Sequence, residues 1–155
     1  MNYSNYYFDC KKEDFNEVNI DSILNGISDL NFNPKKDAIP NLKKELIEIC
    51  SDNGFVIDFF IGEGNLKING LLHKTGLAIQ LGNASRFYAD MLKMQFLKNN
   101  KIIEKMLYFC LTKNSINRSY SSNLISYERF IREKDLFGDI IKLPVLLIGL
   151  EHQNI

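Results

Sequence analysis

Two short apolar runs constrain the fold of this chain more than any other feature. Residues 107–111 and 145–150 carry almost no polar side chain, and Pro144 precedes the second run. Runs of this length without polar alternation are typical of strands that a sheet buries on both faces. A helical spacing of apolar residues over 124–131 lies between them. We therefore expect parallel strands in one sheet, because a helical crossover brings the chain back in the same direction.

The segment before these runs predicts three more strands. Residues 55–61 are rich in β-branched and aromatic side chains, which favour strands. Two further apolar segments follow at 66–73 and 77–81, and short glycine-containing turns separate all three. Connections this short join antiparallel neighbours.

Apolar residues at helical spacing predict helices elsewhere in the chain. One helix spans 20–30, one begins at Pro40, and one follows Asn83, whose side chain is a suitable N-cap. The order of elements predicts one α/β domain over 1–155, with a mixed sheet of about five strands flanked by helices on both faces. Residues 1–18 show no clear periodicity, so they are interpreted as an N-terminal arm that is flexible or contacts a partner.

The composition argues against several classes of protein. Nineteen basic and nineteen acidic residues give a formal net charge of zero, whereas proteins that coat DNA without sequence preference are usually strongly basic. Cys10, Cys50, Cys110 and the two histidines have neither the spacing of a zinc site nor that of a disulfide framework. No apolar run is long enough to span a membrane, and the first residues lack the pattern of a signal peptide, so we expect a cytoplasmic protein.

A family resemblance lies in the hairpin formed by the second and third predicted strands. Residues 67–83 contain Gln80 and Gly82, with Ala78 two positions before the glutamine and Asn69 nine positions before the alanine. This pattern resembles the active-site hairpin of the BglII/BstYI-type restriction endonucleases, a branch of the PD-(D/E)XK nucleases. That family carries Asp at the position of Asn69 and Glu at the position of Ala78.

Other segments support the resemblance, which covers roughly residues 32–150. Residues 86–93 are similar to the helix that follows the family's catalytic hairpin, and 143–150 are similar to its C-terminal strand. The resemblance implies a restriction-endonuclease-like domain that cleaves double-stranded DNA at a short palindrome as a homodimer. It also implies Mg²⁺ as the cofactor, held by the two acids, with Gln80 where related nucleases carry a lysine that orients or polarises the attacking water.

Both metal-binding acids of the family are missing from this chain. Asn69 keeps a carbonyl oxygen without a charge and Ala78 has no ligand atom, so we expect Mg²⁺ binding and DNA cleavage to be nearly abolished. Asp58 and Glu63 are acids near the site, although a strand-face charge and a turn residue are the simpler interpretations of them. Two histories explain the substitutions equally well: deliberate inactivation, and a natural homologue that binds without cutting or has decayed.

Recognition of DNA is expected to fall to the polar loop at 113–122. Lys113, Asn114, Asn117 and Arg118 are residue types that read base edges or anchor phosphates. An ordinary solvated loop explains these residues equally well. Two alternatives to a restriction endonuclease homologue stay open: a non-catalytic DNA-binding or regulatory module on the same fold, and an α/β protein unrelated to DNA.

Overall fold

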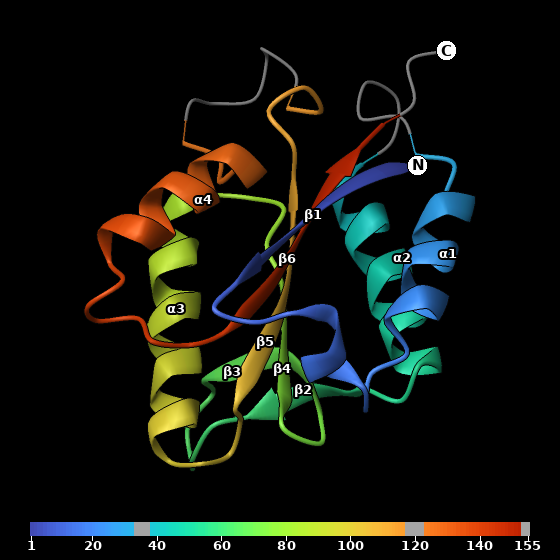
Figure 1. Cartoon of the computed structure of the whole chain (residues 1–155). Helices are drawn as coiled ribbons and strands as arrows, with labels where there is room; N and C mark the ends of the chain where they lie inside the picture. The colour runs from blue at the N-terminus through green and yellow to red at the C-terminus, as the bar shows by residue number, and fades with distance from the viewer. Residues whose placement is uncertain (33–37, 117–122, 153–155) are drawn as a thin grey trace.

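A six-stranded sheet forms the centre of the protein in the computed structural model, which describes residues 1–32, 38–116 and 123–152 (Figure 1). Across the sheet the strands follow the order β1 (Asn2–Phe8), β6 (Val145–Glu151), β5 (Lys105–Leu111), β4 (Thr75–Ile79), β3 (Lys67–Leu72) and β2 (Val56–Phe60). β5 and β6 contain the two apolar runs, and every residue of 106–111 and 145–150 is buried. Their central position in the sheet explains why they lack polar side chains.

The strand directions agree with those predicted from the sequence. β2 pairs with β3 and β3 pairs with β4 antiparallel, through the short turns expected between them. β4 pairs with β5 and β5 pairs with β6 in parallel, and α3 and α4 lie in the respective crossovers. The predicted mixed sheet is therefore confirmed.

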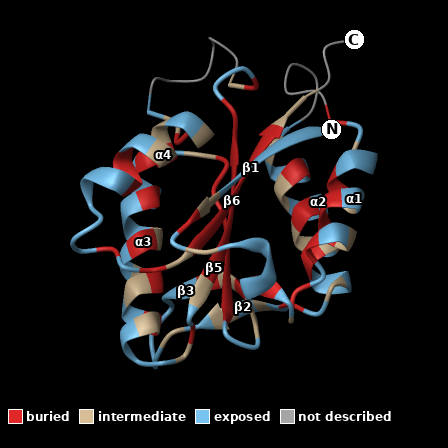
Figure 2. Ribbon diagram, in the orientation of Figure 1, coloured by how far each residue is buried: buried red, intermediate tan, exposed pale blue. Residues whose placement is uncertain are grey.

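Helices cover both faces of the sheet (Figure 1). The helices α1 (Ile20–Asp29) and α2 (Ile39–Asp52) pack on one face, and α3 (Ala84–Asn99) and α4 (Tyr127–Leu136) pack on the other. Each pair closes an apolar core of its own against the sheet, and Figure 2 shows the buried strands and inward helix faces. The predicted single α/β domain with helices on both faces is confirmed.

Side-chain caps fix the starts of α1, α3 and α4. At the start of α1, the side-chain oxygen of Asn19 accepts a hydrogen bond from the N–H of Ser22. The side-chain oxygen of Asn83 accepts a hydrogen bond from the backbone N–H of Ser85, so the predicted cap of α3 is confirmed. Ser126 caps α4 in the same way, through the N–H of Arg129. Such caps satisfy backbone donors that the first turn of a helix leaves without partners. None of the helices described is long and apolar enough to cross a membrane.

The N-terminal segment corrects one expectation from the sequence. Residues 2–8 form the edge strand β1, which pairs antiparallel with β6 along its whole length and makes the sheet six strands wide rather than about five. The amino group of Met1 donates hydrogen bonds to the carbonyl oxygens of Ser28 and Leu30, so this segment is not a loose arm. Most of β1 is exposed, and the sequence therefore lacks the apolar alternation by which a strand is recognised. Contact of this segment with a partner stays a prediction.

Candidate functional site

Asn69 on β3 and Ala78 on β4 face each other where the two strands part. The backbone pairing of β3 with β4 runs from Leu72–Thr75 to Gly70–Leu77, and the next pair in the same register is Asn69 with Ala78. Instead of a backbone bond, the N–H of Ile79 donates to Oδ1 of Asn69 at 2.8 Å. The side chain of Asn69 thus replaces a ladder bond, and the nine-residue spacing brings together the two positions that the sequence predicted.

Asp58 lies opposite Asn69 on the neighbouring strand β2. The β2–β3 pairing includes Ile57–Gly70 and Phe59–Ile68 but skips Asp58, whose φ is +56°. A positive φ is uncommon for a residue with a side chain and here marks an interruption of the strand. The Asp58 carboxylate is exposed and lies 2.9 Å from Nζ of Lys67. This ion pair agrees with its interpretation as a strand-face charge.

Ala78 belongs to the apolar core under α3 and α4. Its side chain is only 2% exposed, and it pairs with Tyr108 on the adjacent strand β5. Its methyl group offers no atom to a metal ion. A carboxylate at this position would enter a packed interior rather than open water.

Both the nitrogen and the oxygen of the buried Gln80 side-chain amide form hydrogen bonds within the protein. Its Nε2 donates to Oδ2 of Asp90 at 3.1 Å, and its Oε1 accepts from the N–H of Gly82 at 3.2 Å. Oδ1 of Asp90 in turn pairs with Nζ of Lys93 at 2.8 Å. Lys93 lies three residues after Asp90 on α3, so one turn of the helix brings the two side chains together. Gln80, Asp90 and Lys93 therefore form a closed polar group.

A buried hydroxyl lies next to this polar group. The Tyr108 side chain is fully buried, and its hydroxyl has no hydrogen-bond partner in the part of the chain that the structure describes. Burial raises the pKa of Tyr108 well above its ordinary value, and the negative charge of Asp90 adds to this effect. Tyr108 thus stays neutral across the physiological range. The apolar pattern of the sequence could not indicate this buried hydroxyl, because Tyr108 fits that pattern as one more apolar residue of β5.

Lys43 brings a positive charge to the same region from α2. The residue is partly buried, and burial is the main cause that lowers its pKa. The charges of Asp90, Arg86 and Lys93 on α3 act on it, as does that of Asp58 on β2. No hydrogen bond or ion pair joins Lys43 to another described residue. The sequence did not single out Lys43, which lies well before the hairpin in the chain.

The residues at the site do not fit the Mg²⁺ ion that the family resemblance implies. Oδ1 of Asn69 accepts from Ile79, Oε1 of Gln80 accepts from Gly82, and Ala78 has no donor atom. The carboxylates of Asp90 and Asp58 are already paired with lysines, Lys93 and Lys67 respectively. In residues 1–32, 38–116 and 123–152, no three His, Cys, Asp or Glu side chains gather as a metal site. Hard divalent ions need charged oxygen ligands, and the site supplies none that is free.

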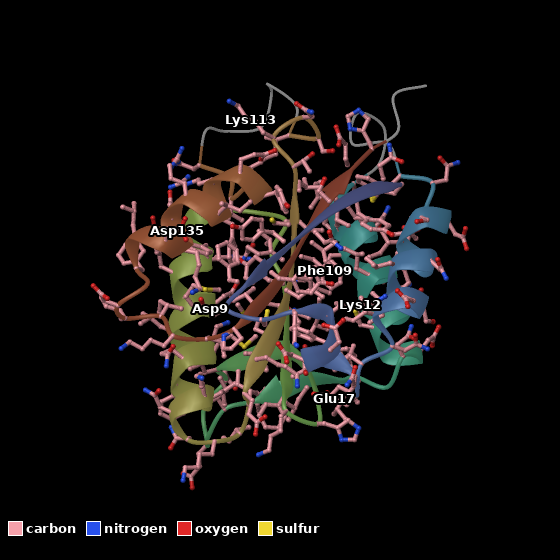
Figure 3. All side chains as sticks on the ribbon, in the orientation of Figure 1. Asp9, Lys12, Glu17, Phe109, Lys113 and Asp135 are labelled. Atoms are coloured by element: carbon pink, nitrogen blue, oxygen red, sulfur yellow. The ribbon has the colours of Figure 1, made fainter. Side chains whose placement is uncertain are left out.

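The predicted DNA-reading loop begins at the end of β5. Lys113 and Asn114 are exposed there. Figure 3 labels Lys113 at this end of the sheet. The backbone N–H of Lys113 donates to Glu128, and Nδ2 of Asn114 donates to Glu151 at 3.1 Å. Both residues thus lie at one end of the sheet, and the side chain of Asn114 is held there by Glu151. Asn117 and Arg118 lie outside the described residues.

Comparisons with known proteins agree with this architecture. The profile of the family Restriction endonuclease BglII/BglIII matches residues 10–150. The crystal structure of restriction endonuclease BglII complexed with a DNA 16-mer is similar to the chain with a TM-score of 0.82 and 10% sequence identity, over 99% of this chain and 79% of that one. The crystal structure of free BglII is similar with a TM-score of 0.65 and 11% identity, over 99% of this chain and 81% of that one. No curated protein sequence gives a significant match.

The profile match covers most of the chain and includes every element from α1 to β6. It also includes Asn69, Ala78 and Gln80, the three positions of the hairpin. The order of strands and helices agrees with the two similar crystal structures across nearly the whole chain. The chain belongs to the BglII/BglIII restriction endonuclease family.

Proposed function

We propose that this chain binds a short double-stranded DNA site and does not cleave it at the rate of an ordinary restriction endonuclease. Family membership supports DNA as the ligand. The expected lack of cleavage rests on Asn69 and Ala78, which face each other on β3 and β4. The family resemblance implies metal-binding acids at these two positions. Both are uncharged, and Ala78 is packed into the core.

The chemistry of phosphodiester hydrolysis explains the expected loss. A divalent metal activates the attacking water and neutralises the charge that develops on the phosphate. Without carboxylate ligands the ion is not held, because uncharged oxygens bind Mg²⁺ weakly. Gln80 cannot take over this role, since its amide is bound to Asp90 and Gly82.

Restoring the two acids tests the proposal. Plasmid DNA is incubated with Mg²⁺ and either the unaltered chain or the double variant Asn69→Asp, Ala78→Glu. We expect no fragments from the unaltered chain and discrete fragments from the variant. Cleavage by the unaltered chain at an ordinary restriction-enzyme rate would disprove the proposal.

Two controls make this experiment decisive. The double variant Asn65→Asp, Ala89→Glu adds the same groups at two exposed positions, so it should not cleave. Circular dichroism must show that the variant with Glu at the buried position 78 is folded. If the restored variant is folded, shifts DNA in a gel and still does not cut, a non-catalytic module is the better description.

A non-catalytic DNA-binding or regulatory module is the second candidate. The closed polar group of Gln80, Asp90 and Lys93 favours this candidate, because these three side chains already bind one another and the backbone of Gly82. Such a group stabilises the site without any ion. If neither cleavage nor a DNA shift is found for either protein, the chain is an α/β protein that does not act on DNA.

A homodimer forms the second part of the proposal, and an exposed apolar surface supports it. The outer side of α3 exposes Tyr88, Leu92 and Phe96. The end of α4 and the residues after it expose Leu136, Phe137 and Ile140. We call these six residues the α3–α4 surface. Four of them line an apolar hollow of about 210 Å³. The six residues expose on the order of 600 Å², taking about 200 Å² for each large side chain.

This area is close to the roughly 800 Å² that each partner buries in a standard interface. A second copy of the chain fits best, because one apolar surface can meet itself across a two-fold axis. Sedimentation analysis should show a dimer for the unaltered chain and a monomer for Leu92→Asp. The control Leu66→Asp changes another exposed leucine, on the β2–β3 hairpin, and should stay dimeric. A monomeric unaltered chain would exclude the dimer.

A further inference from the structure

The exposed side chain of Asn114, just after β5, is held by an acid of the neighbouring strand. Its Nδ2 donates a hydrogen bond to Oε1 of Glu151, the last residue of β6, at 3.1 Å. A carboxylate only accepts hydrogen bonds, so the nitrogen of the Asn114 amide must face Glu151. Glu151 therefore fixes the orientation of an amide that is otherwise free to turn in solvent.

The backbone that carries Asn114 is anchored to the sheet on both sides of this residue. Before it, the N–H of Thr112 donates to the carbonyl oxygen of Leu150 on β6 at 2.9 Å. After it, the hydroxyl of the buried Ser115 accepts a hydrogen bond from the N–H of His152, also at 2.9 Å. A turn with these supports holds an exposed side chain in one place, which recognition of a base requires.

This turn and the hairpin of the candidate site lie at the same edge of the sheet. β4, β5 and β6 are parallel, so their carboxyl ends meet at one edge. Ala78 is near this end of β4, and Asn114 follows the same end of β5. Ligands of sheets with parallel strands commonly bind outside the carboxyl ends. A DNA duplex that lies along this edge can therefore meet both the hairpin and the turn.

The charges at the turn favour contact with bases over contact with phosphates. The carboxylate of Glu128 accepts a hydrogen bond from the backbone N–H of Lys113, so Glu128 and Glu151 both lie at the turn. Two negative charges disfavour a phosphate at Asn114 itself. The exposed Lys113 side chain forms no ion pair with a described residue, and it offsets these charges toward the DNA as a whole.

The groups that Asn114 has left after binding Glu151 match one base better than the other three. Within the described part of the chain, its carbonyl oxygen and its second amide N–H have no hydrogen-bond partner. In the major groove adenine presents an acceptor, N7, beside a donor, the N6 amino group. Guanine presents two acceptors, and cytosine and thymine each offer a single polar group. Only adenine therefore pairs with both free groups of the Asn114 amide.

We infer that Asn114 reads an adenine in the major groove of DNA, and that Glu151 is the residue that positions its amide. This inference rests on the proposed DNA binding and adds the base that one side chain recognises. The sequence alone suggested only that Asn114 contacts DNA. The preferred base and the role of Glu151 follow from the hydrogen bond between the two side chains.

Selection from a pool of DNA duplexes with a randomised central segment tests the assignment. Bound duplexes are recovered in EDTA and in Mg²⁺ and are sequenced. We expect the unaltered chain to favour adenine at one position by roughly 5- to 150-fold, the range for one bidentate contact. Asn114→Ala should abolish the preference at that position alone. Glu151→Ala should weaken it, whereas Glu151→Gln keeps an acceptor oxygen and should retain most of it.

Glu104→Ala is the matched control, because it removes the same charge from an exposed residue at the opposite end of β5 and should leave the preference unchanged. Glu151→Ala also reduces the repulsion of phosphates, so base preference rather than affinity is the decisive quantity. A merely structural role of Glu151 would weaken binding to all duplexes alike and leave the preference as it was, which overturns its positioning role.

An unchanged adenine preference in folded Asn114→Ala overturns the inference, and so does a selected site in which no position favours adenine. In both cases DNA binding by the unaltered chain still supports the proposed function. If the unaltered chain binds no duplex in either buffer, the proposed function fails and this inference fails with it.

Discussion

Asn69 joins β3 to β4 at the point where their backbone pairing stops. Its Oδ1 is the acceptor for the N–H of Ile79, a residue that is almost fully buried. Asn69→Ala should lower the free energy of unfolding by about 1–3 kcal/mol, because it leaves a buried donor without a partner. Asn69→Asp keeps an acceptor and should cost less. Urea denaturation measures both, and Asn65→Ala in the exposed turn should change little; equal losses for Asn69→Ala and Asn65→Ala would contradict the assignment.

Two tyrosines should respond oppositely to loss of their hydroxyl group. The hydroxyl of Tyr108 has no partner within the described ranges, whereas that of Tyr88 donates to Glu133 at 2.6 Å. Tyr108→Phe should therefore leave the free energy of unfolding unchanged or raise it, and Tyr88→Phe should lower it by about 1 kcal/mol. The two variants are compared by thermal and urea unfolding. A large loss in Tyr108→Phe would show that its hydroxyl is bound after all.

The raised pKa of Tyr108 also predicts a pH dependence. In the unfolded chain this tyrosine ionises near pH 10, whereas in the folded protein burial keeps it protonated to higher pH. The folded state then binds the extra proton, so its stability falls as the pH rises above about 10. The fall should be shallower in Tyr108→Phe, by at most about 1.4 kcal/mol per pH unit. Identical slopes in urea titrations at several pH values would contradict this.

How far the sequence predicts the site depends on where its residues lie in the chain. Asn69, Ala78 and Gln80 are on one hairpin, so their spacing in sequence predicts that they meet. Asp90, Lys93 and Lys43 come from helices on two different faces of the sheet, and no local pattern reveals which side of each helix reaches the hairpin. The hydrogen bond between Gln80 and Asp90 could not be predicted from the residues that neighbour Gln80 in the sequence.

At the level of elements, α4 packs closely on the central strand β6. A Cβ atom added at Gly149 would lie 2.6 Å from Cδ2 of the Tyr127 ring, at the start of α4. Gly149→Ala should therefore lower the free energy of unfolding by about 1–3 kcal/mol, because ring and strand must move apart. Gly64→Ala is the control, since its nearest neighbour is 3.9 Å away. Equal melting temperatures for the two variants would show that the contact is loose.

The elements differ in how well the sequence predicts them. β5, β6 and the three hairpin strands follow from composition, because burial on one or both faces leaves a clear apolar pattern. β1 could not be predicted in this way, since its pairing with β6 joins residues far apart in sequence and its side chains face mostly outward. An edge strand of this kind is defined by its partner rather than by its own residues.

For the molecule as a whole, the lack of a charged ligand set among residues 1–32, 38–116 and 123–152 predicts how it responds to metal. Mg²⁺ and Na⁺ at equal ionic strength should give the unaltered chain the same melting temperature. The variant Asn69→Asp, Ala78→Glu should melt at a higher temperature in Mg²⁺, because an ion that binds only the folded state stabilises it. A Mg²⁺-specific shift in the unaltered chain would reveal a metal site that its described side chains do not suggest.

The interruption of β2 at Asp58 has a consequence for association between molecules. β2 is an outer strand of the sheet, and an uninterrupted outer strand offers its free backbone groups as a template for further strands. Here the left-handed residue divides that row in two, and the carboxylate, held by Lys67, adds a charge at the break. Growth of the sheet into fibres from this side is thereby opposed, although Val56 and Phe60 expose apolar surface on the same strand.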